Sequence, residues 1–153
     1  MRRIAVTVTA MLAVLGALWF GHAPPRSTSA YQRQAVQTVE FLHSQTQTAR
    51  LWAAAVDRDV TTRQAASVAL QEAENDAIAT AGRFAGWDPP AGADSVRDTV
   101  TGLGEEVVAA LGGLRIAAHR GRWTDLDDLA APLPDLAAHL DTVRNALIRT
   151  SPQ

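Results

Sequence analysis

One short pattern in the chain has the spacing of a metal-binding motif. Glu40 and His43 stand three positions apart, the pair that helical bundles use to hold two carboxylate-bridged metal ions. Folding four helices antiparallel about turns near residues 60, 90 and 122 would place His43 level with Asp76. The same folding would place Glu105 level with His139. These residues would form one metal-binding layer if their side chains faced the core.

The helical phase of these residues argues against a metal. With Leu42 on the buried stripe, Glu40 points outward and His43 only flanks the stripe. A second Glu-x-x-His motif is missing, because Asp135 stands four positions before His139. We therefore predict no metal and no cofactor, and the metal candidates that the spacing offers are Glu40, His43 and His139.

The other histidines and the arginines raise two further ligand hypotheses. Met1 and Met11 both lie in the N-terminal apolar segment, which excludes a His/Met haem site and leaves a site with two histidines open. A basic cluster ends the third predicted helix and consists of Arg115, His119, Arg120 and Arg122. Cations at a helix C-terminus interact favourably with the helix dipole, so the cluster is explained as a structural terminus. A bound small anion is the alternative.

Composition excludes several classes of function. The chain has 153 residues, a net charge of -2 and no cysteine, so disulfides and cysteine-ligated zinc are excluded. All 14 basic residues are arginines scattered along the chain, which gives no clustered face for nucleic acid. No serine, histidine and acid stand in a nucleophile motif, and an alanine-lined bundle offers little room for a cleft. We predict that the protein is not an enzyme.

The N-terminus has the pattern of a membrane anchor or a signal peptide. Arg2 and Arg3 precede an uncharged run over residues 4–20, which as a helix spans about 25 Å, or about 30 Å if it continues to Ala23. We predict an uncleaved anchor over residues 1–23, because Pro24 is a poor residue after a signal-peptidase cut. A cleaved signal, cut after Ala23 or Ala30, and a secreted product are the alternative. In both cases the basic head stays cytoplasmic and the rest of the chain lies outside.

Beyond a Pro/Ser linker over residues 24–30, the chain predicts an all-α domain over residues 31–150. Apolar residues recur every three to four positions in four segments, as expected for an antiparallel up-and-down four-helix bundle. The stripes are Ala35, Val39, Leu42, Thr46, Ala49, Ala53, Val56 and Val60; Ala66, Leu70, Ala73, Ala77, Thr80 and Phe84; Val96, Val100, Leu103, Val107, Ala110, Leu114 and Ala117; and Leu126, Leu129, Leu133, Leu136, Leu140, Val143 and Leu147.

Local signals predict where these helices begin and end. The first stripe loses its phase near residues 57–62, where Thr61 and Gln64 match a capping box. A single helix over residues 31–85 is the alternative, and it would favour a homodimer. Residues 86–94 form a loop with Asp94 as the next cap. Thr124 or Asp125 caps the fourth helical segment, and prolines 132 and 134 interrupt it. We expect helices over 125–131 and 134–149, and one sharply kinked helix is the alternative.

Four glycines in the third segment need an explanation, since each costs about 1 kcal/mol relative to alanine in a helix. They are Gly102, Gly104, Gly112 and Gly113. Close helix packing, or tolerated sequence drift without a function, is the simpler explanation, and a functional hinge at positions 112 and 113 is the alternative.

The aromatic residues indicate surfaces. Tyr31 and Trp87 fall at the end of the bundle nearest the membrane and are candidates for a membrane interface. For Trp87 we expect that it closes this end of the core beside Phe84, and an interfacial anchor is the alternative. At the opposite end, Trp52 and Trp123 either close the core or mark a partner surface. Together with Arg120 and Arg122, these two tryptophans form the candidate interaction surface.

These observations lead to two functional expectations. The first is a non-catalytic interaction, scaffold or accessory module, anchored in the cytoplasmic membrane by residues 4–23 and binding an unidentified protein partner. The second is an exported carrier of haem, a metal or a small hydrophobic molecule. A carrier requires a cavity lined by inward polar groups, whereas an interaction module requires a dry core and an exposed apolar patch at one end.

Overall fold

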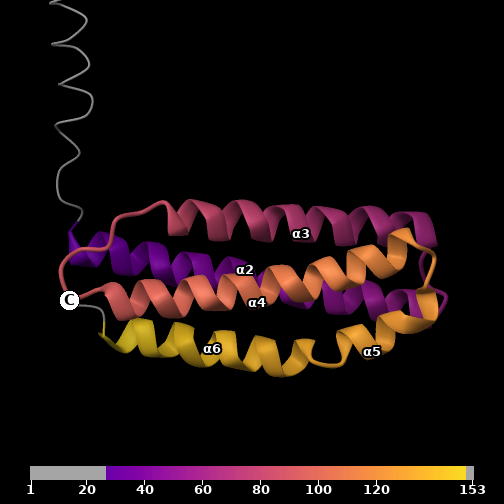
Figure 1. The fold of residues 1–153 in the computed structure, drawn as a ribbon. Helices are drawn as coiled ribbons and strands as arrows, with labels where there is room; N and C mark the ends of the chain where they lie inside the picture. Colours follow the sequence, from indigo (N-terminus) through magenta and orange to yellow (C-terminus); the bar gives the residue numbers. More distant parts are fainter. Residues whose placement is uncertain (1–26, 151–153) are drawn as a thin grey trace, which may run out of the picture.

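The structure is a computed structural model, and it describes residues 27–150. The predicted anchor or signal peptide lies outside these residues. The described part is all-α, as predicted, and has four long helices: α2 (Thr28–Asp57), α3 (Arg63–Ala85), α4 (Asp94–His119) and α6 (Leu133–Thr150). A short 3-10 turn, η1 (Trp123–Asp125), and the helix α5 (Leu126–Ala130) connect α4 to α6. The four long helices run antiparallel, up and down, as Figure 1 shows.

The long helices form a bundle with two distinct ends. α2 packs against both α3 and α6 and reaches α4 across the core, whereas α4 and α6 touch little. Ser27, the 86–93 loop and Thr150 lie at one end, the proximal end (Figure 1). The 58–62 turn and the 120–125 connection lie at the other, which we call the distal end. No helix within residues 27–150 has an apolar stretch long enough to cross a membrane.

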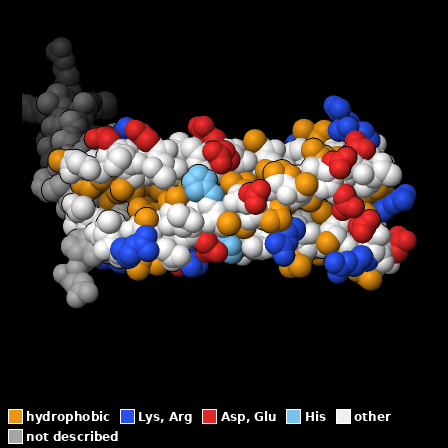
Figure 2. Space-filling model, turned by 90° about the horizontal axis from the view of Figure 1, so that it is seen from below, with side chains coloured by type: hydrophobic (Ala, Val, Ile, Leu, Met, Phe, Trp, Pro, Cys, Tyr) orange, Lys and Arg blue, Asp and Glu red, His pale blue; other side chains and the backbone are white. Residues whose placement is uncertain are grey.

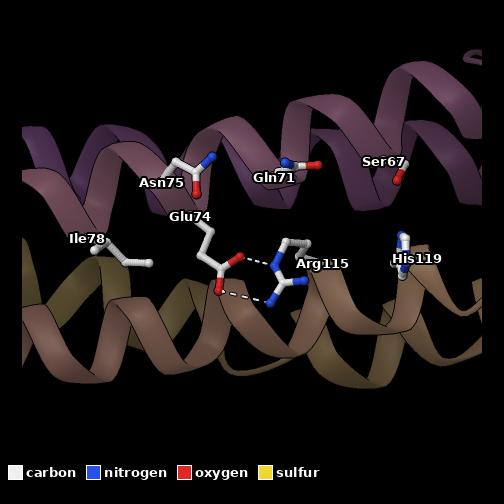
Figure 3. A pocket seen from close by; sticks show the side chains of 7 residues that line it. All are labelled: Ser67, Gln71, Glu74, Asn75, Ile78, Arg115 and His119. Carbon is white, nitrogen blue, oxygen red and sulfur yellow. Dashed lines mark hydrogen bonds and ion pairs between the residues drawn. The ribbon is translucent and has the colours of Figure 1, made fainter.

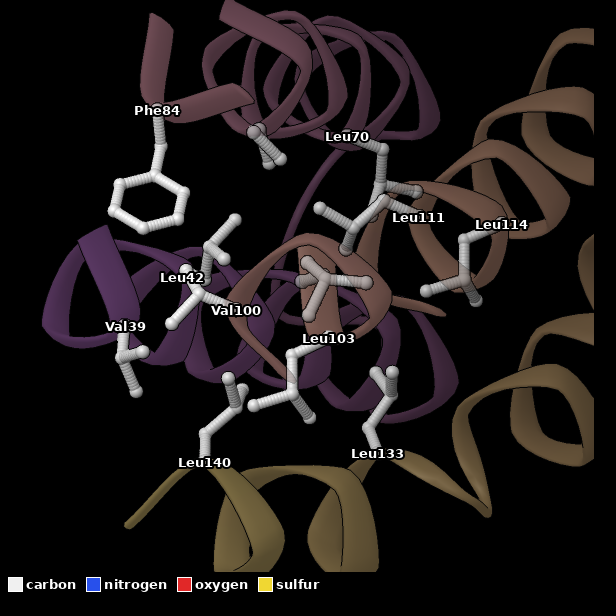
Figure 4. Packing of buried hydrophobic residues seen from close by; sticks show 14 of the residues in the cluster. Val39, Leu42, Leu70, Phe84, Val100, Leu103, Leu111, Leu114, Leu133 and Leu140 are labelled. Carbon is white, nitrogen blue, oxygen red and sulfur yellow. The ribbon is translucent and has the colours of Figure 1, made fainter. Parts of the chain in front are cut away.

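The core is built mostly from the predicted stripes, although on α4 Leu111 is fully buried where Ala110 was predicted. Leucine and valine side chains from all four long helices meet in it, with Phe84 at one edge (Figure 4). A fully buried leucine or valine contributes about 1.5–3 kcal/mol relative to an exposed one, so this cluster is the main source of stability. The first stripe ends sooner than predicted. Val60 is 73% exposed, because α2 stops at Asp57 and Val60 lies in the turn.

The start of α2 differs from the sequence prediction. Ser27 is the N-cap, and its hydroxyl accepts a hydrogen bond from the Ala30 amide at 3.2 Å. This satisfies one of the amides that a helix start leaves unpaired. Residues 28–30, which were predicted as linker, are therefore the first turn of α2.

The predicted break between the first two helices is confirmed, and the alternative of one helix over residues 31–85 is wrong. The chain reverses through Asp59, whose φ of 54° lies in the left-handed region that aspartate tolerates better than most residues. The cap is Thr62 and not Thr61: the Thr62 hydroxyl accepts from the Ala65 amide at 3.2 Å. The continuous helix that would have favoured a homodimer is thus not formed.

The remaining boundaries lie within a few residues of the predictions. Asp94 is the first residue of α4 and not its cap; Ala93 holds that position and caps with no side chain. Asp125, one of the two predicted caps, holds the N-cap position of α5 but makes no side-chain cap hydrogen bond, and residues 123–125 form the 3-10 turn. The prolines separate α5 from α6 as predicted, with Pro134 in the first turn of α6, where its missing amide costs little.

Candidate functional site

The metal candidates do not converge. His43 faces α6, where its Nε2 lies 3.6 Å from Asp141 Oδ2, and on its own helix it lies 3.4 Å from Gln47 Nε2. Glu40 and His139 are exposed. Among residues 27–150, no three His, Cys, Asp or Glu side chains gather as a metal-ligand set. The presence of a histidine at position 43 is therefore explained by its contact with Asp141 between α2 and α6.

Tyr31 is a core residue and not a surface residue. Its side chain is 1% exposed, and its ring packs on Phe84 with the centroids 5.3 Å apart. Burial raises the pKa of the Tyr31 phenol above its ordinary value of 10.0. The ring is inward because Tyr31 belongs to α2 and stands four residues before Ala35, on the buried stripe. Of the two candidates for a membrane contact, Trp87 alone remains partly exposed, and it packs against the core from the 86–93 loop.

The two distal tryptophans close the core. Trp52 and Trp123 are partly buried and pack against the core cluster. The Arg63 guanidinium, from the start of α3, lies 5.8 Å from the centroid of the Trp123 ring, a cation–π contact. This contact ties α3 to the connection between α4 and α5.

The basic cluster at the end of α4 divides into separate interactions. Arg122 donates to Asp125, with Nη1 and Oδ2 3.0 Å apart. Arg120 is exposed, and Arg115 turns instead toward Glu74 of α3. The four residues therefore do not form one anion site.

Exposed apolar side chains concentrate at the distal end. Seven large apolar residues are exposed in the described part of the chain, and four of them lie within about two helical turns of the distal end. These four are Leu51, Val60, Val68 and Ile116. One of them, Ile116, lines a groove of about 440 Å³ between α4 and α5, together with Gly113, Arg122, Asp125, Asp128 and Leu129. We call this hollow the distal groove. On the face in Figure 2, acidic and basic side chains both gather over the same end.

Val60 was predicted on a buried stripe, and the other three residues were not predicted as part of a surface, because the stripes select only the buried face of each helix. Leu51 and Val68 each lie two residues after a stripe position, on the side of the helix that faces away from the core. An apolar residue opposite a buried stripe was the available signal.

A second hollow lies between α3 and α4 and contains a largely buried ion pair. The Glu74 carboxylate accepts from Arg115 Nε, and its Oε1 lies 3.4 Å from Arg115 Nη2. Glu74 is only 8% exposed, although it carries a charge. Gly112 makes room for it, since a Cβ there would lie 3.0 Å from Glu74 Oε1.

This hollow is a polar groove, which we call the α3–α4 groove. Its volume is about 380 Å³, within the range of small-molecule sites. Apart from one isoleucine its lining is polar: Ser67, Gln71, Glu74, Asn75, Ile78, Arg115 and His119 (Figure 3). Arg115 and His119 were predicted as a terminus, and their place in a groove depends on α3, which lies about 40 residues away in sequence.

Comparison with known proteins gives no match: no family model, no curated protein and no solved structure is significantly similar to this chain. The residues and geometry of the chain itself are therefore the basis of the functional proposal.

Proposed function

We propose that the protein is a non-catalytic interaction module, tethered to the cytoplasmic membrane by residues 4–23, with its bundle outside the membrane and its distal end in contact with a protein partner. The uncharged run after Arg2 and Arg3 supports the tether. α2 starts at the proximal end and extends over 30 residues, about 45 Å, so the distal end is the part of the bundle farthest from the attachment point.

The observation that carries the proposal is the placement of the exposed apolar residues. Leu51, Val60, Val68 and Ile116 are distributed around one end of the bundle, and Ile116 lines the distal groove. An excess of exposed apolar residues, bordered by polar groups, marks a candidate protein-binding surface. Acidic and basic residues of the connection, such as Asp128 and Arg122, supply that polar border.

The core favours this function over a carrier that holds haem or a hydrophobic molecule inside the bundle. Its buried side chains are mainly alanine, valine and leucine, packed with Tyr31 and Phe84. A haem carrier with two axial histidines needs imidazoles that face inward. His119 and His139 are exposed, and His43 faces Asp141 at the seam of α2 and α6.

The contact surface can be tested by crosslinking inside the cell. A photoreactive amino acid is placed in the full chain at Val60, at the distal end, and in a matched control at Ile148, which is 51% exposed at the proximal end. We expect one discrete heterologous product from position 60 and none from position 148. Adding Leu51→Glu should abolish the product at position 60. Identical patterns from both positions would contradict the proposal, and a product of twice the chain's mass would assign the surface to a homodimer instead.

A further inference from the structure

The α3–α4 groove holds a guanidinium that is only partly used. Arg115 directs Nε and Nη2 at Glu74, and its remaining nitrogen, Nη1, has no hydrogen-bond partner among residues 27–150. In Figure 3 this nitrogen is turned away from Glu74, toward the end of the groove where His119 lies. The Arg115 side chain is one-third exposed, so a ligand in the groove can reach it.

Glu74 fixes the orientation of this guanidinium. The carboxylate is buried against Gly112, and it holds the planar guanidinium through two of its nitrogens. A guanidinium whose plane is already fixed loses little entropy when it binds a further acceptor. The pair is neutral overall, which lowers the attraction of the site for multiply charged anions.

Other donors face the same end of the groove. His119 follows Arg115 by one turn of α4, so both side chains project on the same side of that helix. Across the groove, Ser67 and Gln71 stand one turn apart on α3 (Figure 3). A guanidinium, an imidazole, a hydroxyl and an amide around one space match a ligand with two acceptor oxygens, because each of these groups can donate a hydrogen bond.

We propose that the α3–α4 groove binds a small monocarboxylate, with the ligand oxygens on Arg115 Nη1 and His119 and with Glu74 as a positioning residue behind the guanidinium. This site is separate from the distal groove. Arg115 and His119 face α3, whereas Gly113 and Ile116, on the same stretch of α4, line the distal groove on another side of that helix. A negative result for the ligand site would therefore leave the proposed contact surface unaffected, and the reverse also holds.

The test is an NMR titration of the full chain in detergent micelles with sodium acetate at constant ionic strength. We expect saturable shifts of the His119 ring and the Arg115 Nε–H signal, no saturable shift with chloride, and a weaker response to inorganic phosphate, whose second charge approaches Glu74. His119→Ala should weaken acetate binding about tenfold, as expected for loss of a charge-assisted hydrogen bond. Arg120→Ala is the matched control, and it should leave binding unchanged because Arg120 lies outside the groove.

Two further variants test the site without removing Arg115. Glu74→Gln removes the negative charge behind the guanidinium, so it should raise the response to phosphate relative to acetate. Gln71→Ala removes a donor from the opposite wall and should weaken acetate binding. Equal shifts with acetate and chloride would overturn the proposal, as would tighter binding of phosphate than of acetate. Binding that is insensitive to His119→Ala would overturn it too.

Discussion

Gly104 of α4 lies directly against Ala81 of α3: a Cβ atom on Gly104 would be 2.9 Å from the Cβ atom of Ala81. The two helices approach so closely here that only a glycine fits. Gly112 makes similar room, for the carboxylate of Glu74, whereas a Cβ on Gly102 would have no neighbour within 4 Å. Close packing thus explains two of the four glycines, and α4 continues as a regular helix through positions 112 and 113, with no break at the suggested hinge.

Gly104→Ala should destabilise the bundle, because the added methyl group forces α3 and α4 apart; overpacking of this kind costs about 1–3 kcal/mol. Gly102→Ala is the matched control on the same helix and should stabilise by about 0.5–1 kcal/mol through helix propensity alone. Chemical denaturation gives both free energies of unfolding. Equal stabilisation by both substitutions would show that the helices are not in contact at Gly104.

Arg115→Met should lower the free energy of unfolding by about 2–4 kcal/mol, because the Glu74 carboxylate stays buried without its partner. The double variant Glu74→Leu with Arg115→Met should recover most of this loss, since replacing a buried pair by apolar residues is often neutral. Denaturant unfolding of both single variants and the double variant gives the free energies for a double-mutant cycle. Additive losses in the double variant would mean that the two side chains act independently.

Tyr31→Phe should leave the bundle at least as stable at neutral pH, and more stable by about 1 kcal/mol if the ring keeps its place. The reason is that the buried Tyr31 hydroxyl has no hydrogen-bond partner among residues 27–150. Thermal unfolding at pH 7 measures the change. A clear loss of stability would show that the Tyr31 hydroxyl is hydrogen-bonded in solution.

Alkaline pH should destabilise the folded chain through Tyr31. Because burial raises the pKa of this phenol in the folded state, the folded chain holds its proton more tightly than the unfolded chain does. The resulting stability is fully present below pH 10 and declines as the pH rises through the raised folded pKa. The chain has one tyrosine, so the tyrosinate absorbance reports this group alone. In Tyr31→Phe this loss of stability at alkaline pH should disappear. An unchanged loss of stability would show that other groups cause it.

The periodicity of apolar residues was sufficient to predict the four helices and most of their buried stripes, because burial of one face per helix is a local property of the sequence. The exceptions are Val60, which is exposed, and Leu111, which is buried in place of Ala110.

Glu74 was not predictable from this periodicity. Its burial depends on Arg115 and Gly112, which approach it only after α3 and α4 pack. Tyr31 was predicted at the surface because the linker was predicted to reach residue 30. In the structure α2 begins at Thr28, and Tyr31, four residues before Ala35, continues the buried stripe.

The most direct test of the tethered module is the intact mass and the cell fraction of the full-length protein expressed in a bacterium. The proposal predicts a chain that retains residues 1–23 and is recovered with the membrane. A start at Tyr31 would remove the Ser27 cap and the first turn of α2, so a cleaved form should begin near Pro24. A soluble product that begins there would contradict the tether and favour an exported carrier.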